Sequence, residues 1–305
     1  MQKKRQCICY GIGSAILFGV SGILASFVFR NKSISPEWLV GIRMFFGGII
    51  LLTLLAIRGY NIFTLFKHRN DVILLISFGI LGVFLAQSSF FMSVYYGDAA
   101  TATVLQSLGP TIIVLLISFK HRVLPSRIEY ITISLALIGV FLLVTNGSLT
   151  HLNVDGQAII WGIISAFGVA GYTLIPRPLL KNNNALIVVA WGLFIGGVVE
   201  NSIHPIWIIP INMNEDSILL IIFITLGGTL LAYALYIASL SALPPTVASL
   251  LGTVEPLTAT TLSVTLLQLR LEAFQFVGIL LILSTVLLIS LPVKQLNKIK
   301  KHPLN

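Results

Sequence analysis

Three charged side chains lie inside long apolar stretches of the sequence: Arg43, Glu200 and Glu255. A charge at the centre of a lipid bilayer costs about 2.5–3.5 kcal/mol on insertion scales, so each one needs a physical reason to be there. Glu255 lies about ten residues into its stretch, near the middle of a spanning helix. Its carboxylate could bind a substrate amine or carry a coupling proton, or it could be a buried carboxyl bonded to another helix.

Arg43 lies about five residues inside the outer end of its stretch, where a long side chain can still reach the membrane interface. Two interpretations stay open. The guanidinium either reaches that interface, or it contacts a substrate carboxylate or forms a gate. Glu200 lies near the same end of the membrane in another stretch. A pair of Arg43 with Glu200 that closes the outer side is therefore one hypothesis.

Other stretches carry polar and aromatic side chains at helical spacing, so that each set shares one helix face. Cavities for small organic ligands are mostly apolar and aromatic with a few polar groups, and these faces fit that description. The alternative is that they pack against neighbouring helices or, for Tyr95, belong to the interfacial aromatic belt. The candidates for a substrate cavity or gate, besides Arg43 and Glu255, are Gln87, Phe91, Tyr95, Gln106, Tyr233 and Tyr236.

Pro110 and Pro256 each interrupt an apolar stretch. A proline removes one backbone donor and frees a carbonyl one turn earlier. Within a membrane such a break is tolerated where neighbours or a cavity satisfy the freed group. Both prolines are candidate hinges, and ordinary kinks are the alternative.

The composition places these residues in a membrane protein. Hydrophobic residues make up 56% of the 305 positions and charged residues 10%, with a mean hydropathy of +0.98. A soluble domain carries roughly a quarter charged residues, so a cytosolic enzyme and a disordered chain are excluded. The net charge of +9 does not indicate a nucleic-acid partner, because the charges lie between the apolar stretches. We expect a lipid bilayer and a small-molecule solute as partners, no cofactor or metal, and a monomer or homodimer.

Apolar stretches of about 20 residues recur along the chain, the length a helix needs to cross the hydrocarbon core. They predict an all-α integral membrane protein with ten transmembrane helices, over 9–29, 38–57, 72–95, 99–119, 129–145, 157–176, 185–203, 217–240, 246–267 and 273–291. With this threading, fifteen of the 19 Lys and Arg fall on the side of the N-terminus, against Arg30, Lys32 and Arg270 on the other. The positive-inside rule then predicts that both termini are cytoplasmic.

The second half of the sequence repeats the first. At a lag of 146 residues, Gly82 aligns with Gly228 and Pro110 with Pro256. For the first helix of each half, two lags compete. A lag of 149 pairs Phe18-Gly19 with Phe167-Gly168, and a lag of 151 pairs the stripe Gly11, Ala15 and Gly19 with Gly162, Ala166 and Ala170.

Each half holds five expected spans, and because five is odd the second copy must enter the membrane from the opposite side. We therefore predict two inverted five-helix repeats, residues 1–145 and 146–305, the second ending in a short basic cytoplasmic tail, in one transmembrane unit. Such repeats are typical of transporters, because two near-equivalent halves can open to either face around a central site.

The small-residue-rich first helix with Phe18-Gly19, Arg43 in the second helix, and prolines in the fourth and ninth resemble the drug/metabolite transporter superfamily. The sequence is most similar to its ten-helix EamA-type members, over residues 9–291, and above all in the stretch 248–257. Members of that family are bacterial inner-membrane exporters or facilitators of amino acids and other small metabolites. The small four-helix relatives carry an essential Glu in their first helix, whereas this sequence has no acid between Cys9 and Phe29.

These observations predict a secondary transporter that moves a small polar metabolite, such as an amino acid or a related compound, by alternating access. The resemblance alone implies export across a bacterial inner membrane. One alternative is a proton-coupled drug or cation extruder that uses Glu255. Another is an intramembrane enzyme, which would need a cluster of His, Asp, Glu or Cys at one depth that the sequence does not show.

Overall fold

The computed structural model describes residues 2–29, 34–122, 124–148, 151–210, 213, 215–240 and 251–290. Several sequence predictions fall outside these residues: Arg30, Lys32, the first part of the expected span 246–267, and the basic tail from Lys294 to Lys301. The described part of the chain is helical throughout, with short connections and no strand. An all-α fold is therefore what these residues form.

The helices follow the predicted stretches closely. Their bounds are α1 Gln2–Phe29, α2 Pro36–Ile57, the 3-10 helix η1 Thr64–Lys67, α3 Arg69–Ser77, the π-helix η2 Phe78–Phe84, α4 Leu85–Tyr96, α5 Ala99–Gln106, α6 Gly109–His121, α7 Arg127–Thr145, α8 Gly156–Leu174, α9 Arg177–Asn182, α10 Ala185–Ile203, α11 Glu215–Thr225, the π-helix η3 Leu226–Leu231, α12 Ala232–Leu240, α14 Val254–Leu266 and α15 Ala273–Ser290. The third and eighth expected spans are each built from three of these segments, α3-η2-α4 and α11-η3-α12.

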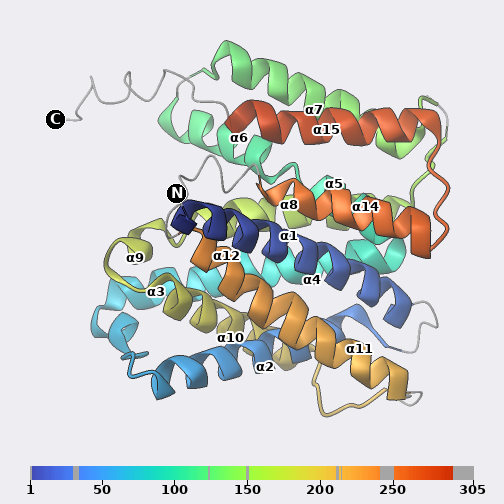
Figure 1. Cartoon of the computed structure of the whole chain (residues 1–305). Coiled ribbons are helices and arrows are strands. Elements are labelled where there is room, and N and C mark those ends of the chain that lie inside the picture. Colours follow the sequence, from blue (N-terminus) through green and yellow to red (C-terminus); the bar gives the residue numbers. More distant parts are fainter. Residues whose placement is uncertain are drawn as a thin grey trace.

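Eight helical rods in the described residues are long and apolar enough to cross a membrane. The ninth and tenth expected spans correspond to the shorter helices α14 and α15, so the count of ten remains a prediction. In Figure 1, α1 begins and α15 ends at the same end of the bundle, as an even number of crossings requires.

Polar residues in the short connections fix where several helices begin. Each accepts a hydrogen bond from a backbone N–H of the first turn, which would otherwise lack a partner. Ser35 caps α2 ahead of Pro36 in this way, Asp98 caps α5, and Asn184 caps α10. Ser126 and Glu129 form a reciprocal capping box at the start of α7. The polar residues between the apolar stretches therefore determine where these helices begin.

The outer surface of the bundle carries many large apolar side chains. Phe119, Leu137 and Leu219 are each more than 60% exposed and lie on helices rather than on loops. Such a surface is unstable in water, whereas lipid tails are its natural solvent. The exposed apolar side chains therefore indicate that the protein is embedded in a bilayer.

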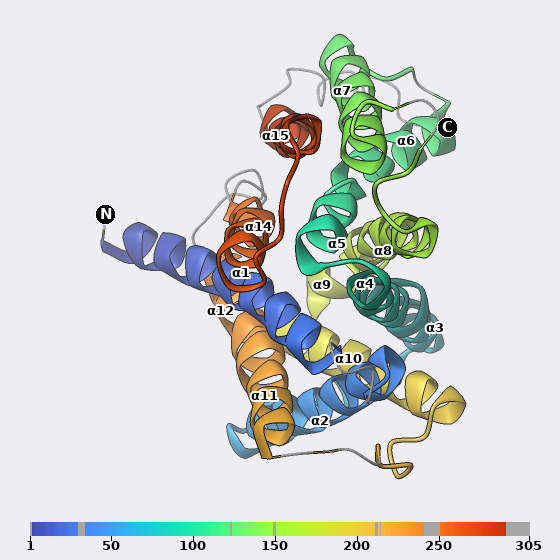
Figure 2. The ribbon, with the colours of Figure 1, turned by 90° about the vertical axis from the view of Figure 1, so that its right-hand side faces the viewer.

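The packing of the helices follows the sequence repeat. α2 packs against α10 and α7 against α15, and each of these pairs joins a helix to its equivalent in the other half. The contact of α4 with α8 is matched by the contact of α12 with α1. Seen from the side in Figure 2, α1, α12 and α14 form one group, and α8, α4 and α5 form another.

The close contacts of the glycines distinguish between the two lags for the first helix. A Cβ added to Gly11 would meet Leu251 and Ser239, and one added to Gly162 would meet Leu105 and Ser93. Leu105 and Ser93 are related to Leu251 and Ser239 by 146 residues, so the contacts match when Gly11 is paired with Gly162. The lag for α1 and α8 is therefore 151.

Two π-helical segments occur at equivalent places, η2 in the third expected span and η3 in the eighth. Each contains a glycine of the aligned pair, Gly82 or Gly228. A π-segment widens one helical turn and is found most often at functional sites. The two π-segments therefore indicate that the helices that follow them, α4 and α12, belong to a functional site.

Candidate functional site

A cavity of about 290 Å³ lies between the two groups of helices. It is lined from one side by α1, α12 and α14 and from the other by α4, α5, α6 and α8. On α1 it involves the N-terminal half, and on α8 and the rod α11-η3-α12 the C-terminal half. The cavity therefore extends from the middle of the bundle toward the end at which α1 begins.

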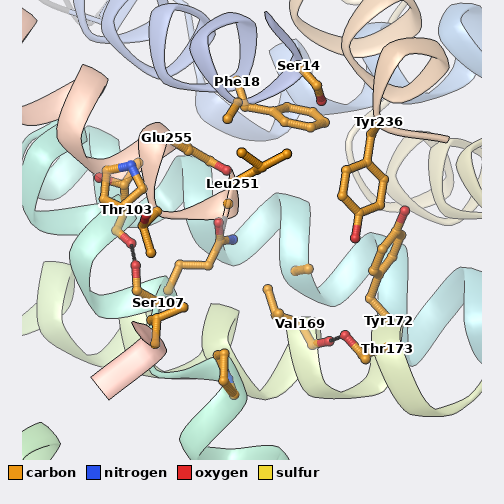
Figure 3. Close-up of a pocket in the computed structure, with 18 of the residues that line it drawn as sticks. Ser14, Phe18, Thr103, Ser107, Val169, Tyr172, Thr173, Tyr236, Leu251 and Glu255 are labelled. Atoms are coloured by element: carbon orange, nitrogen blue, oxygen red, sulfur yellow. Dashed lines mark hydrogen bonds between the residues drawn. The ribbon is translucent and has the colours of Figure 1, made fainter. Parts of the chain in front are cut away.

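The walls of this large cavity are mainly apolar and aromatic, with a few polar groups. Figure 3 shows Glu255 on one side of the cavity and the rings of Tyr172 and Tyr236 on the other. Gln87 donates a hydrogen bond from Nε2 to the hydroxyl of Tyr233, at 2.8 Å. These two residues are 146 apart, so this bond joins equivalent positions of the two halves. This combination of walls and polar groups is typical of a site for a small organic molecule.

A second, small chamber of about 30 Å³ adjoins the first. The two share Phe18, Gln87, Gln106 and Glu255 as lining residues, and the small chamber adds Ser21, Arg43, Phe90 and Phe91. A guanidinium, a carboxyl group, two amides and a hydroxyl therefore border one small space.

The side chain of Arg43 is only 2% exposed and is held by contacts with other helices. Its Nε donates to the hydroxyl of Thr229 at 2.9 Å, its Nη2 to the carbonyl of Gly228 at 3.4 Å, and its Cζ lies 4.4 Å from the centre of the Phe91 ring. Thr229 and Gly228 belong to the π-segment η3. Nη1 has no hydrogen-bond partner. One arm of the guanidinium thus lacks a partner within the described part of the protein.

Two sequence hypotheses about Arg43 are wrong. Its head group does not reach the membrane interface, because the side chain is buried between α2, η3 and α4. It does not pair with Glu200 either. Glu200 accepts a hydrogen bond from Ser88 and lies 3.2 Å from Nδ1 of His204, which is the one ion pair within 4.0 Å among the described residues.

Pro110 and Pro256 both line the large cavity. The fourth expected span is broken just before Pro110, where α5 ends at Gln106 and α6 begins at Gly109, and α14 begins two residues before Pro256. Without an N–H, the prolines cannot bond the carbonyls one turn earlier, those of Gln106 and Gly252. Gln106 and Gly252 also line the cavity, so the helix breaks face the space where a solute would lie.

The other candidates fall in three groups. Gln87, Gln106, Tyr233, Tyr236 and Glu255 line the large cavity, and Phe91 lines the small chamber. Tyr95 lies outside both, because its ring packs edge-on against Phe29 and Tyr96, with centroids 5.7 and 5.2 Å away. For Tyr95 the structure therefore agrees with the alternative of packing.

Sequence reasoning missed Ser21 and Tyr172. At a lag of 151 these two residues are equivalent, and they lie on the equivalent helices α1 and α8. Polar residues at matched positions in both halves were the available signal. The signal became visible only once the contacts of Gly11 and Gly162 had fixed the lag.

Comparison with known proteins gives this architecture a family. The sequence pattern of the EamA-like transporter family matches twice, at residues 5–145 and 156–291. The uncharacterized inner membrane transporter YicL of Salmonella typhimurium is 36% identical over 278 residues, which cover 91% of this chain and 93% of that protein. Protein PecM of Dickeya dadantii is 26% identical over 68% of this chain and 70% of its own length.

A solved crystal structure superposes on this one with a TM-score of 0.63 and 17% identity, covering 93% of this chain and 97% of the other. At this identity the likeness establishes a shared fold. This superposition and the two family matches each cover nearly the whole chain. The protein belongs to the EamA-like transporter family and is a multi-pass membrane transporter of the bacterial inner membrane.

Proposed function

We propose that this transporter exports a small polar metabolite, an amino acid or a related zwitterion, by alternating access around the two adjoining cavities. One observation carries the proposal. Arg43 and Glu255, a cation and a carboxylate without an ion pair between them, border the same small chamber beside a cavity of about 290 Å³. A zwitterion supplies the two charges that such a pair of side chains lacks.

The matched helix contacts support alternating access. A contact between one helix of the first half and a non-equivalent helix has a counterpart made by the equivalent helices. If the two halves exchange conformations, the first contact breaks and its counterpart forms, so that the two ends of the bundle open in turn. α1 packs on α4, whereas the described part of the chain shows no similar packing of the equivalent pair, α8 on α12. The bundle is thus closed at one end and open at the other.

The distribution of Lys and Arg gives this arrangement a direction. With the N-terminus in the cytoplasm, the large cavity opens toward the cytoplasm and Arg43 lies on the sealed, outer side of it. Export is the direction that the family resemblance implies. A solute would enter from the cytoplasm, bind between Glu255 and Arg43, and leave once the seal around Arg43 opens.

The test is flux in proteoliposomes against a panel of amino acids, amines and nucleosides, with Arg43→Ala and Glu255→Gln beside the unaltered protein. We expect amino acid flux in the unaltered protein and a fall of tenfold or more in both variants, since each loses a charged contact worth about 1.5–3 kcal/mol. Ser26→Ala, on the lining helix α1 but outside both cavities, serves as the control. Unchanged flux in both charge variants would discard the site and leave the family assignment intact.

A proton-coupled extruder of organic cations is the second candidate, because Glu255 also faces the aromatic walls of the large cavity. In that case a pH gradient drives flux of amines rather than amino acids. Glu255→Gln would remove the response to the gradient, whereas Arg43→Ala would leave most of the flux. The same panel therefore separates the two candidates.

A further inference from the structure

The hydrogen-bond donors that face the small chamber are only partly used. Nη1 of Arg43 and Oγ of Ser21 are buried, with the two residues 2% and 1% exposed, and neither atom has a hydrogen-bond partner. A buried donor without a partner is destabilising. Both residues line the same chamber. Two unsatisfied donors beside one small space predict that an acceptor binds within it.

The residues that line the chamber also include an acceptor. Glu255 offers carboxylate oxygens and lies at the boundary with the large cavity, since it lines both spaces. The chamber therefore combines donors on α1 and α2 with an acceptor on α14. This polarity matches an α-amino acid, whose carboxylate and ammonium groups are attached to the same carbon.

We propose that the small chamber is the head-group subsite of the transporter, in which Ser21 and Arg43 Nη1 bind the α-carboxylate of an amino acid and Glu255 binds its ammonium group. This assignment rests on the proposed function and makes it more specific, since Ser21 is a binding residue. The substrate side chain then extends into the large cavity, past Phe18 and toward Tyr172 and Tyr236.

The two spaces predict different degrees of selectivity. The chamber of about 30 Å³ is small and is bordered by Arg43, and Glu255 lies where it meets the large cavity, so we expect a substrate that carries both a carboxylate and an ammonium group. The cavity of about 290 Å³ has mostly apolar walls and accepts side chains of different shapes. We expect strict recognition of the head group and tolerance of the side chain.

The experiment uses proteoliposomes and the solute that the panel above shows to be transported, and it measures how strongly other compounds compete with it. The competitors are the twenty L-amino acids and two amines that lack the carboxylate. These amines are 3-methylbutylamine, which corresponds to leucine, and 2-phenylethylamine, which corresponds to phenylalanine. Ser21→Ala removes one hydroxyl without filling the chamber. We expect it to weaken competition by amino acids about tenfold, which is about 1.4 kcal/mol, and to leave competition by the amines unchanged. Arg43→Lys keeps the charge but loses the second donor arm, so we expect a similar selective loss.

Ser26→Ala is the matched control, because Ser26 lies on the same helix and its hydroxyl bonds only the carbonyl of Gly22, at 3.3 Å. Folding of each variant is checked by its melting temperature in detergent. Amino acid competition that is unchanged in Ser21→Ala would overturn the assignment and leave a chamber that holds only water. An equal loss for amino acids and amines would overturn it too. If another solute is carried and no amino acid competes, the subsite is wrong but the transporter stands, whereas an absence of any flux contradicts the proposed function itself.

Discussion

The two ends of the bundle are built from equivalent helices and differ in whether those helices meet. At the end where α1 finishes, Gly22 faces Phe90 and Ala99, and α1 packs directly on α4 and α5. The equivalents of Gly22 and Phe90 are Thr173 and Tyr236, and both line the large cavity. Matched sequence positions therefore form a seal at one end and a cavity wall at the other, which is the arrangement that alternating access requires.

The strongest test of this comparison locks the sealed end. A Cβ on Gly22 would lie 3.5 Å from the Cβ of Ala99, within the range of a disulfide, so Gly22→Cys with Ala99→Cys should cross-link on oxidation. The native Cys7 and Cys9 are first replaced by Ser. We expect flux in proteoliposomes to fall to background and to return when the bond is reduced.

The matched control uses the open end. Thr173→Cys with Tyr236→Cys should react with a short bifunctional thiol reagent only when that end closes, so its yield should fall once the first pair is locked. If the locked protein still transports at its normal rate, the seal between α1 and α5 is not a moving contact and the comparison of the two ends fails.

A smaller effect is expected from Thr229→Val. Gly47-Gly48 of α2 aligns with Gly196-Gly197 of α10 at a lag of 149, and the contacts of Gly48 with Phe194 and of Gly197 with Phe45 match at this lag. Arg43 therefore has no charged equivalent in the second half, because Gly192 takes its place. The bond from Arg43 to Thr229 therefore stabilises the sealed end and has no counterpart at the other end. Its loss leaves a buried guanidinium N–H unpaired, which costs about 1–3 kcal/mol and shifts the two states by roughly 5- to 150-fold.

The shift is measured as the rate at which a membrane-impermeant thiol reagent labels Thr173→Cys, with and without Thr229→Val. We expect slower labelling in the double variant, because fewer molecules have that end open. Thr225→Val is the control, since Thr225 belongs to the same rod but its hydroxyl bonds only the carbonyl of Ile221. Equal labelling in both backgrounds would show that Arg43 does not bias the two states.

Much of this architecture could be predicted from the sequence, because the hydrophobic length of a spanning helix is a local property. The expected stretches 38–57 and 185–203 differ from α2 and α10 by two residues at most. Arg43 and Glu255 were identified because a charge in an apolar stretch is rare. The ninth stretch shows the limit, since a helix break before Pro256 depends on its surroundings as much as on the proline.

The partners of the charges could not be predicted, because they are set by which helices cross and at what depth. Arg43 and Glu200 looked suitable for each other by charge and depth. In the fold, η3 brings Thr229 to Arg43, and α4 brings Ser88 to Glu200. The importance of Ser21 likewise depends on a chamber that forms only when α1, α2 and α14 meet.

The smallest effect is expected from the hydrogen bond between Gln87 and Tyr233, which the comparison of the two ends predicts to favour neither state. Gln87 and Tyr233 are equivalent residues bonded to each other, so exchange of the two conformations maps their bond onto itself. Such a bond can persist in both states. Tyr233→Phe should then lower the melting temperature by the equivalent of about 1 kcal/mol, the typical worth of one hydrogen bond, while the labelling rate of Thr173→Cys changes less than about twofold. A labelling change as large as that of Thr229→Val would show that the bond exists in one state only, and that the halves do not exchange conformations about an axis through Gln87 and Tyr233.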